Sequence, residues 1–124
     1  MQIFCGTDII EIERIKREID QHGKKFINRI YTEDEINYCE SKRLAKYQHY
    51  AARFAGKEAI FKAVSKRLDN KYDITWTSVE IVNDKNGRPK VNILDEKLEK
   101  IKEIDISLSH CKEYAVAMVV AEVE

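Results

Sequence analysis

The chain has 124 residues, of which 44% are hydrophobic and 35% are charged, with one proline and four glycines. This composition supports a packed core and excludes the disordered, collagen-like and low-complexity classes, and the length fits one compact domain over residues 1–124. The 22 basic and 22 acidic residues cancel, so the net charge alone predicts neither a nucleic-acid binder nor an acidic tail.

The three cysteines, Cys5, Cys39 and Cys111, are few and odd in number, which argues against a disulfide framework and favours a reducing cytosol. The first residues lack the basic and apolar regions of a signal peptide. No run reaches the roughly 18 consecutive apolar residues of a membrane-spanning helix. We therefore expect a cytoplasmic protein without a membrane partner.

The N-terminal part passes from a strand signal to helix signals. Residues 1–10 are rich in β-forming side chains, and isoleucines then recur at helical spacing between residues 11 and 22. Gly23 predicts the end of that helix, and a second short helix is expected over 24–31.

The sequence in the middle of the chain predicts a helix N-terminus with a capping box, followed by a long helix. Thr32, followed three residues later by Glu35, is the pattern of a capping box. A longer helix is expected over 42–68, with its larger apolar residues largely on one face. These residues are Tyr47, Tyr50, Phe54, Phe61, Val64 and Leu68.

After Asp69 the pattern changes to strands, with turn residues between them. In order, we expect a strand over 75–84, a turn at 84–87, a strand over 88–94, a short helix over 95–103, and strands over 105–111 and 113–123. The last strand is apolar enough to be central. This order predicts an α+β fold, in which a mainly antiparallel sheet packs against one long helix and several short helices.

Positive charge is concentrated in two segments, although the total is zero. Residues 42–71 hold nine Lys or Arg against two acids, and residues 14–29 hold six against two. Residues 95–124 lean the other way, with eight acids against four bases. A basic half suggests a phosphate-rich ligand or an acidic partner; ordinary solvated helix faces explain the counts equally well.

Four charged residues of the long helix lie near its apolar stripe or at its edge: Arg53, Lys57, Glu58 and Lys62. A purely structural helix would place them on the opposite side. In a purely structural interpretation, the aliphatic parts of the basic side chains pack along the apolar stripe while their charged ends reach solvent, and Glu58 and Lys62 form an ordinary intrahelical ion pair. In a functional one, the carboxylate holds a cation while the three basic groups line a phosphate site.

Asp8 interrupts the first predicted strand, where an unpaired carboxylate is disfavoured. It could cap or begin the helix that follows. It could instead be a metal ligand, because one Asp and one Glu from distant segments, with waters and substrate phosphates, are a usual way to hold Mg²⁺.

His110 shares one face of its predicted strand with Ile106 and Leu108. A lone histidine there is more often a satisfied structural residue than a catalytic one. Cys111 beside it is too little for a zinc site, because no second spaced pair of ligands is present.

Three runs, in this order, resemble the signatures of the 4'-phosphopantetheinyl transferases: GTDIIEIERI, RFAGKEAIFKA and SLSHCKEYAVAMV. Length, order and spacing are similar to the short, single-domain type of that family, the holo-[acyl-carrier-protein] synthases, and NGRPKV resembles its Gly-x-Pro hairpin. One departure is Phe4, where many members have a further glycine; Asp8 is intact.

The resemblance implies Mg²⁺-dependent transfer of the 4'-phosphopantetheine arm of coenzyme A to a serine of apo acyl-carrier protein. Adenosine 3',5'-bisphosphate would be released, and the activity would support fatty acid biosynthesis. Asp8 and Glu58 match the family's Mg²⁺ ligands. Glu58, directly or through water, would accept the serine proton, and Lys62 would stabilise or protonate the leaving phosphate. The positions implied to contact the coenzyme are Arg53, Lys57, Lys62, Gly87, Pro89 and His110.

The expected macromolecular partner is acidic. Acyl-carrier proteins are small and strongly acidic, so a receiving surface should be basic, and Arg14 falls on a family position that contacts the carrier. The candidate surface consists of Arg14, Arg17, Lys24, Lys25 and Arg29. Family members of this short type resemble homotrimers with active sites shared between subunits, and a small chain gains ligand-enclosing surface by assembling.

Two other classes use the same residues. A non-catalytic module could bind nucleotide or RNA through the basic helices, but no RNA-binding signature is present, and Asp8 and Glu58 would repel phosphate unless a cation intervened. An Mg²⁺-dependent phosphohydrolase would use the same two acids and need no carrier protein.

Overall fold

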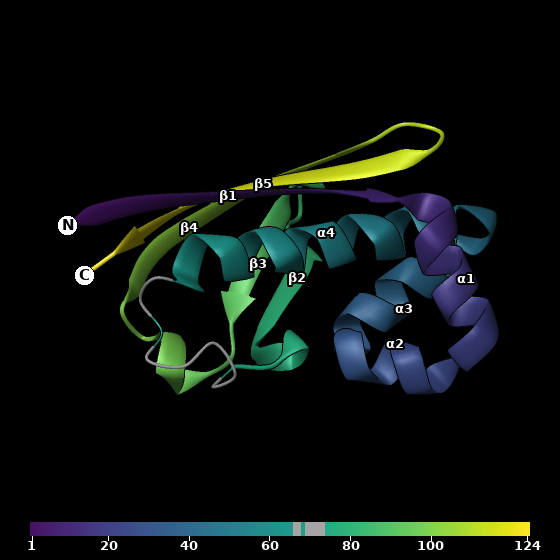
Figure 1. Ribbon diagram of the computed structural model, residues 1–124, viewed down its shortest axis with the longest axis horizontal. Coiled ribbons are helices and arrows are strands. Elements are labelled where there is room, and N and C mark those ends of the chain that lie inside the picture. Colours follow the sequence, from purple (N-terminus) through teal and green to yellow (C-terminus); the bar gives the residue numbers. More distant parts are fainter. Residues whose placement is uncertain (66–67, 69–73) are drawn as a thin grey trace.

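The computed structural model describes residues 1–65, 68 and 74–124 (Figure 1). Its elements follow in this order: β1 (Gln2–Glu11), α1 (Ile12–His22), α2 (Lys24–Ile30), α3 (Glu33–Ser41), the 3-10 turn η1 (Arg43–Ala45), α4 (Lys46–Val64), the 3-10 turn η3 (Trp76–Ser78), β2 (Val79–Asn83), β3 (Pro89–Ile93), the 3-10 turn η4 (Glu96–Leu98), β4 (Ile101–His110) and β5 (Tyr114–Val123).

Three long strands form an antiparallel sheet in the order β1–β5–β4, and β2 and β3 form a separate antiparallel hairpin. Figure 1 shows α4 running beneath the length of the three-stranded sheet, with the hairpin crossing behind it and α1 to α3 gathered at one end. The predicted α+β fold, a mainly antiparallel sheet packed against one long helix and several short helices, is confirmed, and β5 is central as its apolar sequence indicates.

The core lies between the sheet and α4, and small side chains let the two approach closely. Ala55 and Ala59 of α4 are fully buried, as are Ala115 and Ala117 of β5. Because side chains alternate along a strand, the odd-numbered residues of β5 face α4, and its even-numbered residues face away.

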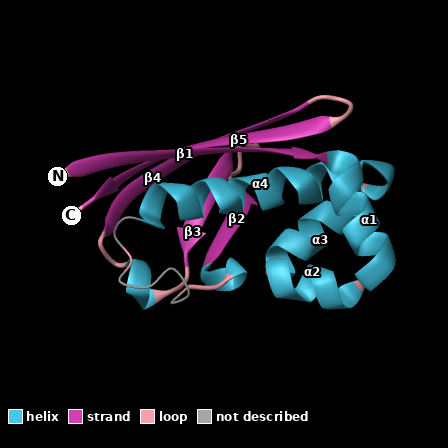
Figure 2. Cartoon of the chain, in the orientation of Figure 1, coloured by secondary structure: helices cyan, strands magenta, loops and turns pink. Residues whose placement is uncertain are grey.

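No described element covers the opposite face of the sheet (Figure 2), on which the side chains of β1 and β5 are mostly apolar and those of β4 are polar or acidic. Ile3 and Ile9 of β1 are 68% and 63% exposed, and Met118 of β5 is 53% exposed. Contiguous apolar surface of this kind is typical of an interaction face.

The long helix is shorter than the sequence predicts, and its apolar residues do not form a single stripe. Arg43 adopts a left-handed φ of 54°, which interrupts the helix predicted over 42–68, and α4 spans only Lys46–Val64. Because the sheet, the hairpin and α1 to α3 all pack on α4, it is buried nearly all round, whereas Phe54 and Phe61 are only partly buried. Residues 66–67 of the predicted helix, and 66–67 and 69–71 of the basic segment, lie outside the described residues.

The helix predicted over 95–103 is wrong apart from one turn at Glu96–Leu98. β4 begins already at Ile101, which pairs with Val123 of β5, and a register shift follows between Ile101 and Glu103. Hydrogen bonding to the central strand outweighs the weak local helix preference of this segment. Likewise, the strand predicted over 75–84 begins with the 3-10 turn η3 and becomes β2 only at Val79.

The remaining predicted elements are confirmed. The capping box at the start of α3 is present, with Glu35 N–H donating to the Thr32 hydroxyl and Thr32 N–H donating to the Glu35 carboxylate.

Among the described residues, no helix is both long enough and apolar enough to cross a membrane.

Candidate active site

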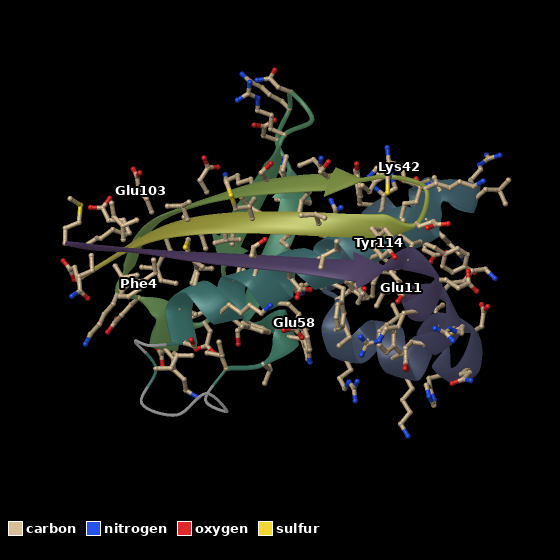
Figure 3. The ribbon with its side chains drawn as sticks, turned by 45° about the horizontal axis from the view of Figure 1, so that its top comes forward. Phe4, Glu11, Lys42, Glu58, Glu103 and Tyr114 are labelled. Atoms are coloured by element: carbon tan, nitrogen blue, oxygen red, sulfur yellow. The ribbon has the colours of Figure 1, made fainter. Side chains whose placement is uncertain are left out.

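β1 crosses α4 at Gly6, and this crossing brings Asp8 next to the helix. A Cβ atom added to Gly6 would overlap the carbonyl oxygen of Ala59 and lie 2.9 Å from the nitrogen of Ala63. Any larger residue would therefore push the strand away from the helix. Phe4, the departure from the family pattern, is only partly buried, lies toward the start of β1 (Figure 3) and leaves the crossing at Gly6 intact.

Three predicted site residues meet at this crossing: Asp8 from β1, and Glu58 and Lys62 from α4. The Lys62 ammonium donates to Asp8 Oδ1 over 3.1 Å and to the backbone oxygen of Thr7 over 3.0 Å. The Asp8 side chain is 17% exposed and that of Lys62 is 54% exposed, so the group is open to a ligand. Figure 3 shows Glu58 on the β1 side of the sheet.

The negative charge of Asp8 disfavours the charged form of Glu58. Partial burial raises the pKa of Glu58, the negative charge of Asp8 raises it further, and the positive charges of Lys62 and Arg14 lower it. A raised pKa makes Glu58 a stronger base, and the repulsion between the two acids favours a cation bound to both.

The structural explanations of these acids do not hold in the structure. The N-cap of α1 is Glu11, and Asp8 lies inside β1, so Asp8 caps no helix. Among the described residues, the ion pair of Lys62 is with Asp8 across the strand–helix contact, and the expected intrahelical pair of Lys62 with Glu58 does not form.

The chemistry of this donor set fits Mg²⁺, which is usually held by one or two carboxylates and completes its octahedron with waters and substrate phosphates. Asp8 and Glu58 supply two carboxylates. In the described ranges no group of three or more His, Cys, Asp or Glu residues could hold a metal, so the arrangement does not match the closed cage of a structural zinc site.

A second group of predicted residues lies around the ring of Tyr38 on α3. The guanidinium of Arg53 lies 4.2 Å from the ring centroid, and the Lys42 ammonium lies 4.7 Å from it. Arg53 is 2% exposed, donates to Asn83 Oδ1 through Nη2, and has a buried Nε–H without a hydrogen-bond partner in the described structure. The cost of leaving a buried donor unpaired makes this guanidinium receptive to an acceptor.

Two histidines complete this cluster. The ring of His49 on α4 lies 5.4 Å from that of Tyr38 and 6.1 Å from that of His110, measured between centroids. His110 is the last residue of β4 and is exposed, so it is not a satisfied core histidine. We call Tyr38, Lys42, His49, Arg53 and His110 the Tyr38 cluster.

The β2–β3 hairpin is tied to the Tyr38 cluster through Asn83. Asn83 accepts from Arg53 and donates through Nδ2 to the carbonyl oxygen of Gly87 over 2.9 Å. Gly87 has a φ of 83°, which a glycine adopts without strain, and Pro89, which begins β3, pairs with Asn83. The hairpin positions predicted to contact the coenzyme are thus held near Arg53.

Lys57, which the sequence predicts to contact the coenzyme, lies in the core instead. Its side chain is fully buried, and its ammonium donates to Glu35 Oε1 over 2.7 Å, to the backbone oxygen of Ile30 over 2.8 Å and to that of Trp76 over 2.9 Å. An ammonium has three protons, so none remains for a phosphate. These contacts argue against the predicted coenzyme contact of Lys57, because the residue is enclosed by α2, α3 and η3.

Glu35 holds the same network together from the other side. Its carboxylate also accepts from the backbone N–H of Thr32 and of Ile81, each over 2.8 Å. Burial lowers the pKa of Lys57, and the charge of Glu35 opposes that shift. The pair fastens α3 and β2 to the middle of α4.

The two groups of predicted residues lie on opposite sides of one chain. Asp8 belongs to the β1 edge of the sheet, and His110 belongs to the β4 edge. Along α4, His49 and Glu58 are nine residues apart, which is about 180° around a helix. Figure 3 shows Glu58 on the β1 side and Lys42 near the end of β4. Within one chain, the two groups are therefore separated by the central strand of the sheet and by the body of α4.

The residues predicted to receive the carrier protein are all exposed and come from two neighbouring helices. Arg14 and Arg17 belong to α1, and Lys24, Lys25 and Arg29 belong to α2. Arg14 also acts electrostatically on Glu58, so the basic surface adjoins the acids. A pocket of 320 Å³ on this surface is lined by Glu18, His22, Lys25, Phe26 and Arg29.

Sequence reasoning missed several residues of the site. His49 lies one helical turn before Arg53, a spacing that could have identified it. Tyr38 and Asn83 reach the cluster only through the packing of α3 and the hairpin, and no local pattern marks them. Trp76, which stacks on Phe54 with ring centroids 4.9 Å apart, likewise carried no motif.

Comparison with known proteins bears on the family and the fold of the chain. A holo-[acyl-carrier-protein] synthase of Ruminiclostridium cellulolyticum is 43% identical over 97% of this chain and 92% of its own length. One of Dehalococcoides mccartyi is 44% identical over 97% of this chain and 98% of its own. The crystal structure of a holo-(acyl-carrier-protein) synthase from Bacillus anthracis in complex with CoA (3',5'-ADP) is 35% identical, has a TM-score of 0.78, and covers 98% of this chain and 96% of that one.

The model of the 4'-phosphopantetheinyl transferase superfamily matches residues 4–119, a range that includes both edges of the site. Together with relatives that are more than 40% identical over nearly the whole chain, this match shows that the chain belongs to the 4'-phosphopantetheinyl transferase superfamily.

Proposed function

We propose that this chain is a holo-[acyl-carrier-protein] synthase, which transfers the 4'-phosphopantetheine arm of coenzyme A to a serine of apo acyl-carrier protein. The observation that carries the proposal is the meeting of Asp8, Glu58 and Lys62 at the β1–α4 crossing. Relatives named for this activity, and the coenzyme complex of the Bacillus anthracis protein, support it.

In the reaction, the serine oxygen forms a bond to the β-phosphorus of the coenzyme. The bond from that phosphorus to the bridging oxygen breaks, so that adenosine 3',5'-bisphosphate leaves. Mg²⁺ held by Asp8 and Glu58 would neutralise the charge that develops on the pyrophosphate.

Glu58, directly or through a water, accepts the proton of the serine hydroxyl. Lys62 acts on the leaving phosphate. Two of its protons go to Asp8 and Thr7, so the third is available to a phosphate oxygen. The ion pair with Asp8 holds the ammonium in place beside the acids.

Arg53 and His110, with the hairpin residues Gly87 and Pro89, would bind the phosphates of the coenzyme. Arg53 offers the unpaired Nε–H, and His110 is exposed at the end of β4. These residues lie on the edge opposite Asp8, so one coenzyme can contact both groups only if they come from different subunits.

We therefore propose a homotrimer whose active sites are each shared by two subunits. A cyclic assembly brings the β1 edge of one subunit to the β4 edge of the next. The uncovered outer face of the sheet, with the exposed Ile3, Ile9 and Met118, supplies apolar surface for burial between subunits.

A complementation experiment tests the sharing. Lys62→Ala removes a group from the β1 edge, and His110→Ala removes one from the β4 edge, so each variant alone should be inactive. When both variants are co-expressed, about a quarter of the shared sites in random assemblies carry both intact edges and should be active. No recovery, in assemblies that light scattering shows to contain both chains, would refute the sharing.

The carrier protein would dock on the basic surface of α1 and α2, which adjoins Glu58 through Arg14. Complementary charge would steer the acidic carrier to that side of the active site. We place the reaction in the cytoplasm, because the three cysteines are free and disulfides are rare there.

The decisive experiment incubates the protein with coenzyme A, Mg²⁺ and apo acyl-carrier protein, and weighs the carrier by mass spectrometry. A mass increase of one phosphopantetheine, absent without coenzyme, is the expected result. Cleavage of the coenzyme without a change in the carrier would indicate a phosphohydrolase. Binding of coenzyme without any reaction would indicate a non-catalytic module; either result would refute the proposed function.

A further inference from the structure

His49 lies inside the Tyr38 cluster, although it belongs to none of the motifs that the chain shares with the family. Its ring is half-buried between Tyr38 of α3 and His110 of β4. One helical turn along α4 lies Arg53, whose Nε–H is buried and unpartnered in the described structure. A polar ring with two nitrogens is thus held near the guanidinium of Arg53, which forms no ion pair with any described residue.

The charges that act on His49 are all positive. Burial is the largest cause of a lowered pKa of His49, and Arg53 of α4, Lys42 at the end of α3 and His110 of β4 act in the same direction. Together they lower the pKa of His49 to about 4. On α3, the carboxylate of Glu40 is bound by the Tyr50 hydroxyl over 2.6 Å and the Lys46 ammonium over 3.4 Å. The free protein therefore keeps His49 neutral at physiological pH and leaves an excess of positive charge around it.

We propose that His49, whose ring lies against those of Tyr38 and His110, is a further binding residue for a phosphate group of the coenzyme. When a phosphate dianion binds there, the ring of His49 takes up a proton. This inference rests on the proposed function, because it assumes that the Tyr38 cluster faces the coenzyme. It adds to that function a residue outside the family motifs and a linkage between binding and proton uptake.

The proton is taken up because a bound dianion changes the sign of the electrostatic potential at the His49 ring. A dianion close to the ring replaces a repulsive environment with an attractive one, and opposite charge within a few ångströms raises a histidine pKa by about two to three units. The imidazolium then donates from both nitrogens. Binding should therefore take up protons near pH 6, and the coenzyme should bind more tightly as the pH falls from 8 to 6.

Isothermal titration of the intact protein with coenzyme A, at pH 6 in buffers of different ionisation enthalpy, measures the protons taken up per coenzyme. The test variant is His49→Gln, and the matched control is His22→Gln, an exposed histidine of α1. The phosphate group also titrates near pH 6, but its contribution is common to all three proteins and cancels in the differences.

We expect wild type and His22→Gln to take up about half a proton more than His49→Gln. Between pH 8 and pH 6, the affinity of the wild type should gain about three- to fivefold relative to His49→Gln. Equal proton uptake in all three proteins overturns the proposal. Should His49→Gln fail to fold, NMR titration of the His49 ring in the wild type decides: its pKa must rise when coenzyme A is added, and an unchanged pKa overturns the proposal.

Dephospho-coenzyme A, which lacks the 3'-phosphate, shows which phosphate is recognised. Loss of the proton uptake with this analogue assigns His49 to the 3'-phosphate, and retained uptake assigns it to the pyrophosphate; both results support the proposal. The carrier-mass assay distinguishes a failure of the proposed function from a failure of the inference about His49. If wild type modifies the carrier but the proton uptake does not depend on His49, the inference falls and the proposed function stands.

Discussion

The two lysines of α4, Lys57 and Lys62, should respond in opposite ways to the same substitution. Lys57 is fully buried and donates three hydrogen bonds, whereas Lys62 is 54% exposed. Lys57→Met leaves the buried carboxylate of Glu35 without its counter-charge. Removing one partner of a buried ion pair costs about 3–5 kcal/mol of unfolding free energy, whereas an exposed pair such as Lys62–Asp8 is worth at most about 1 kcal/mol.

Urea denaturation at fixed protein concentration measures this difference. With an m-value of about 2 kcal/mol/M for a chain of this size, Lys57→Met should lower the unfolding midpoint by about 1.5–2.5 M. Lys62→Met should shift the midpoint by about 0.5 M or less but lose transfer activity. The double variant Glu35→Gln/Lys57→Met removes both charges and should recover part of the lost stability.

Coenzyme affinity decides between a structural and a ligand-binding Lys57. In the double variant, coenzyme affinity should stay within about threefold of the wild type. A lysine that donates to phosphate would instead contribute about 1.5–3 kcal/mol, or about 10- to 150-fold in affinity. A loss of that size, with the urea midpoint unchanged, would refute the structural assignment of Lys57.

Four further outcomes are expected. Glu58→Gln should abolish most transfer activity yet, measured without metal, melt no lower than wild type in calorimetry, because it removes the charge that burial and Asp8 disfavour; a variant that stays active would contradict the base and metal roles. Lys62→Ala should lower kcat more than it weakens coenzyme binding by titration, and the reverse would make Lys62 a ground-state ligand. Arg14→Glu should raise the carrier's KM far more than the coenzyme's, and carrier binding should weaken with salt; a flat salt profile argues against this surface. For His49, whose pKa is lowered to about 4, the unfolded chain binds a proton that the folded chain lacks between about pH 6.5 and 4. As the pH is lowered from 6.5 to 4, the free energy of unfolding of the wild type should therefore decrease more steeply than that of His49→Gln in urea titrations. Parallel curves for the two proteins would contradict the lowered pKa of His49.

Patterns that depend on neighbours in sequence were reliable here. The capping box of Thr32 and Glu35, the strand that carries Asp8 and the central position of β5 all follow from local spacing and composition. The helix predicted over 95–103 failed because pairing with β5 offers this segment more hydrogen bonds and burial than a short isolated helix.

The sequence did not predict which faces of α4 are covered by other elements. A helical wheel gives the angle of each side chain but does not tell what packs against it, and α4 turned out to be covered on several sides. Arg53 and Lys57 both lie toward the interior, but the guanidinium of Arg53 retains an unpaired donor, whereas the ammonium of Lys57 is used completely. Residue type alone does not distinguish the two.

From the sequence by itself came the α+β fold, the identity of Asp8, Glu58 and Lys62 as a group, and the family resemblance that joins them. Only the tertiary structure decided that Gly6 brings the strand against α4, that Lys57 is a buried partner of Glu35, and that His49 joins Arg53 and His110 at the opposite edge. The physical reason is distance along the chain. Periodicity and capping act over one or two helical turns, whereas these contacts join segments tens of residues apart, whose meeting is set by the packing of α4 between the sheet, the hairpin and the short helices.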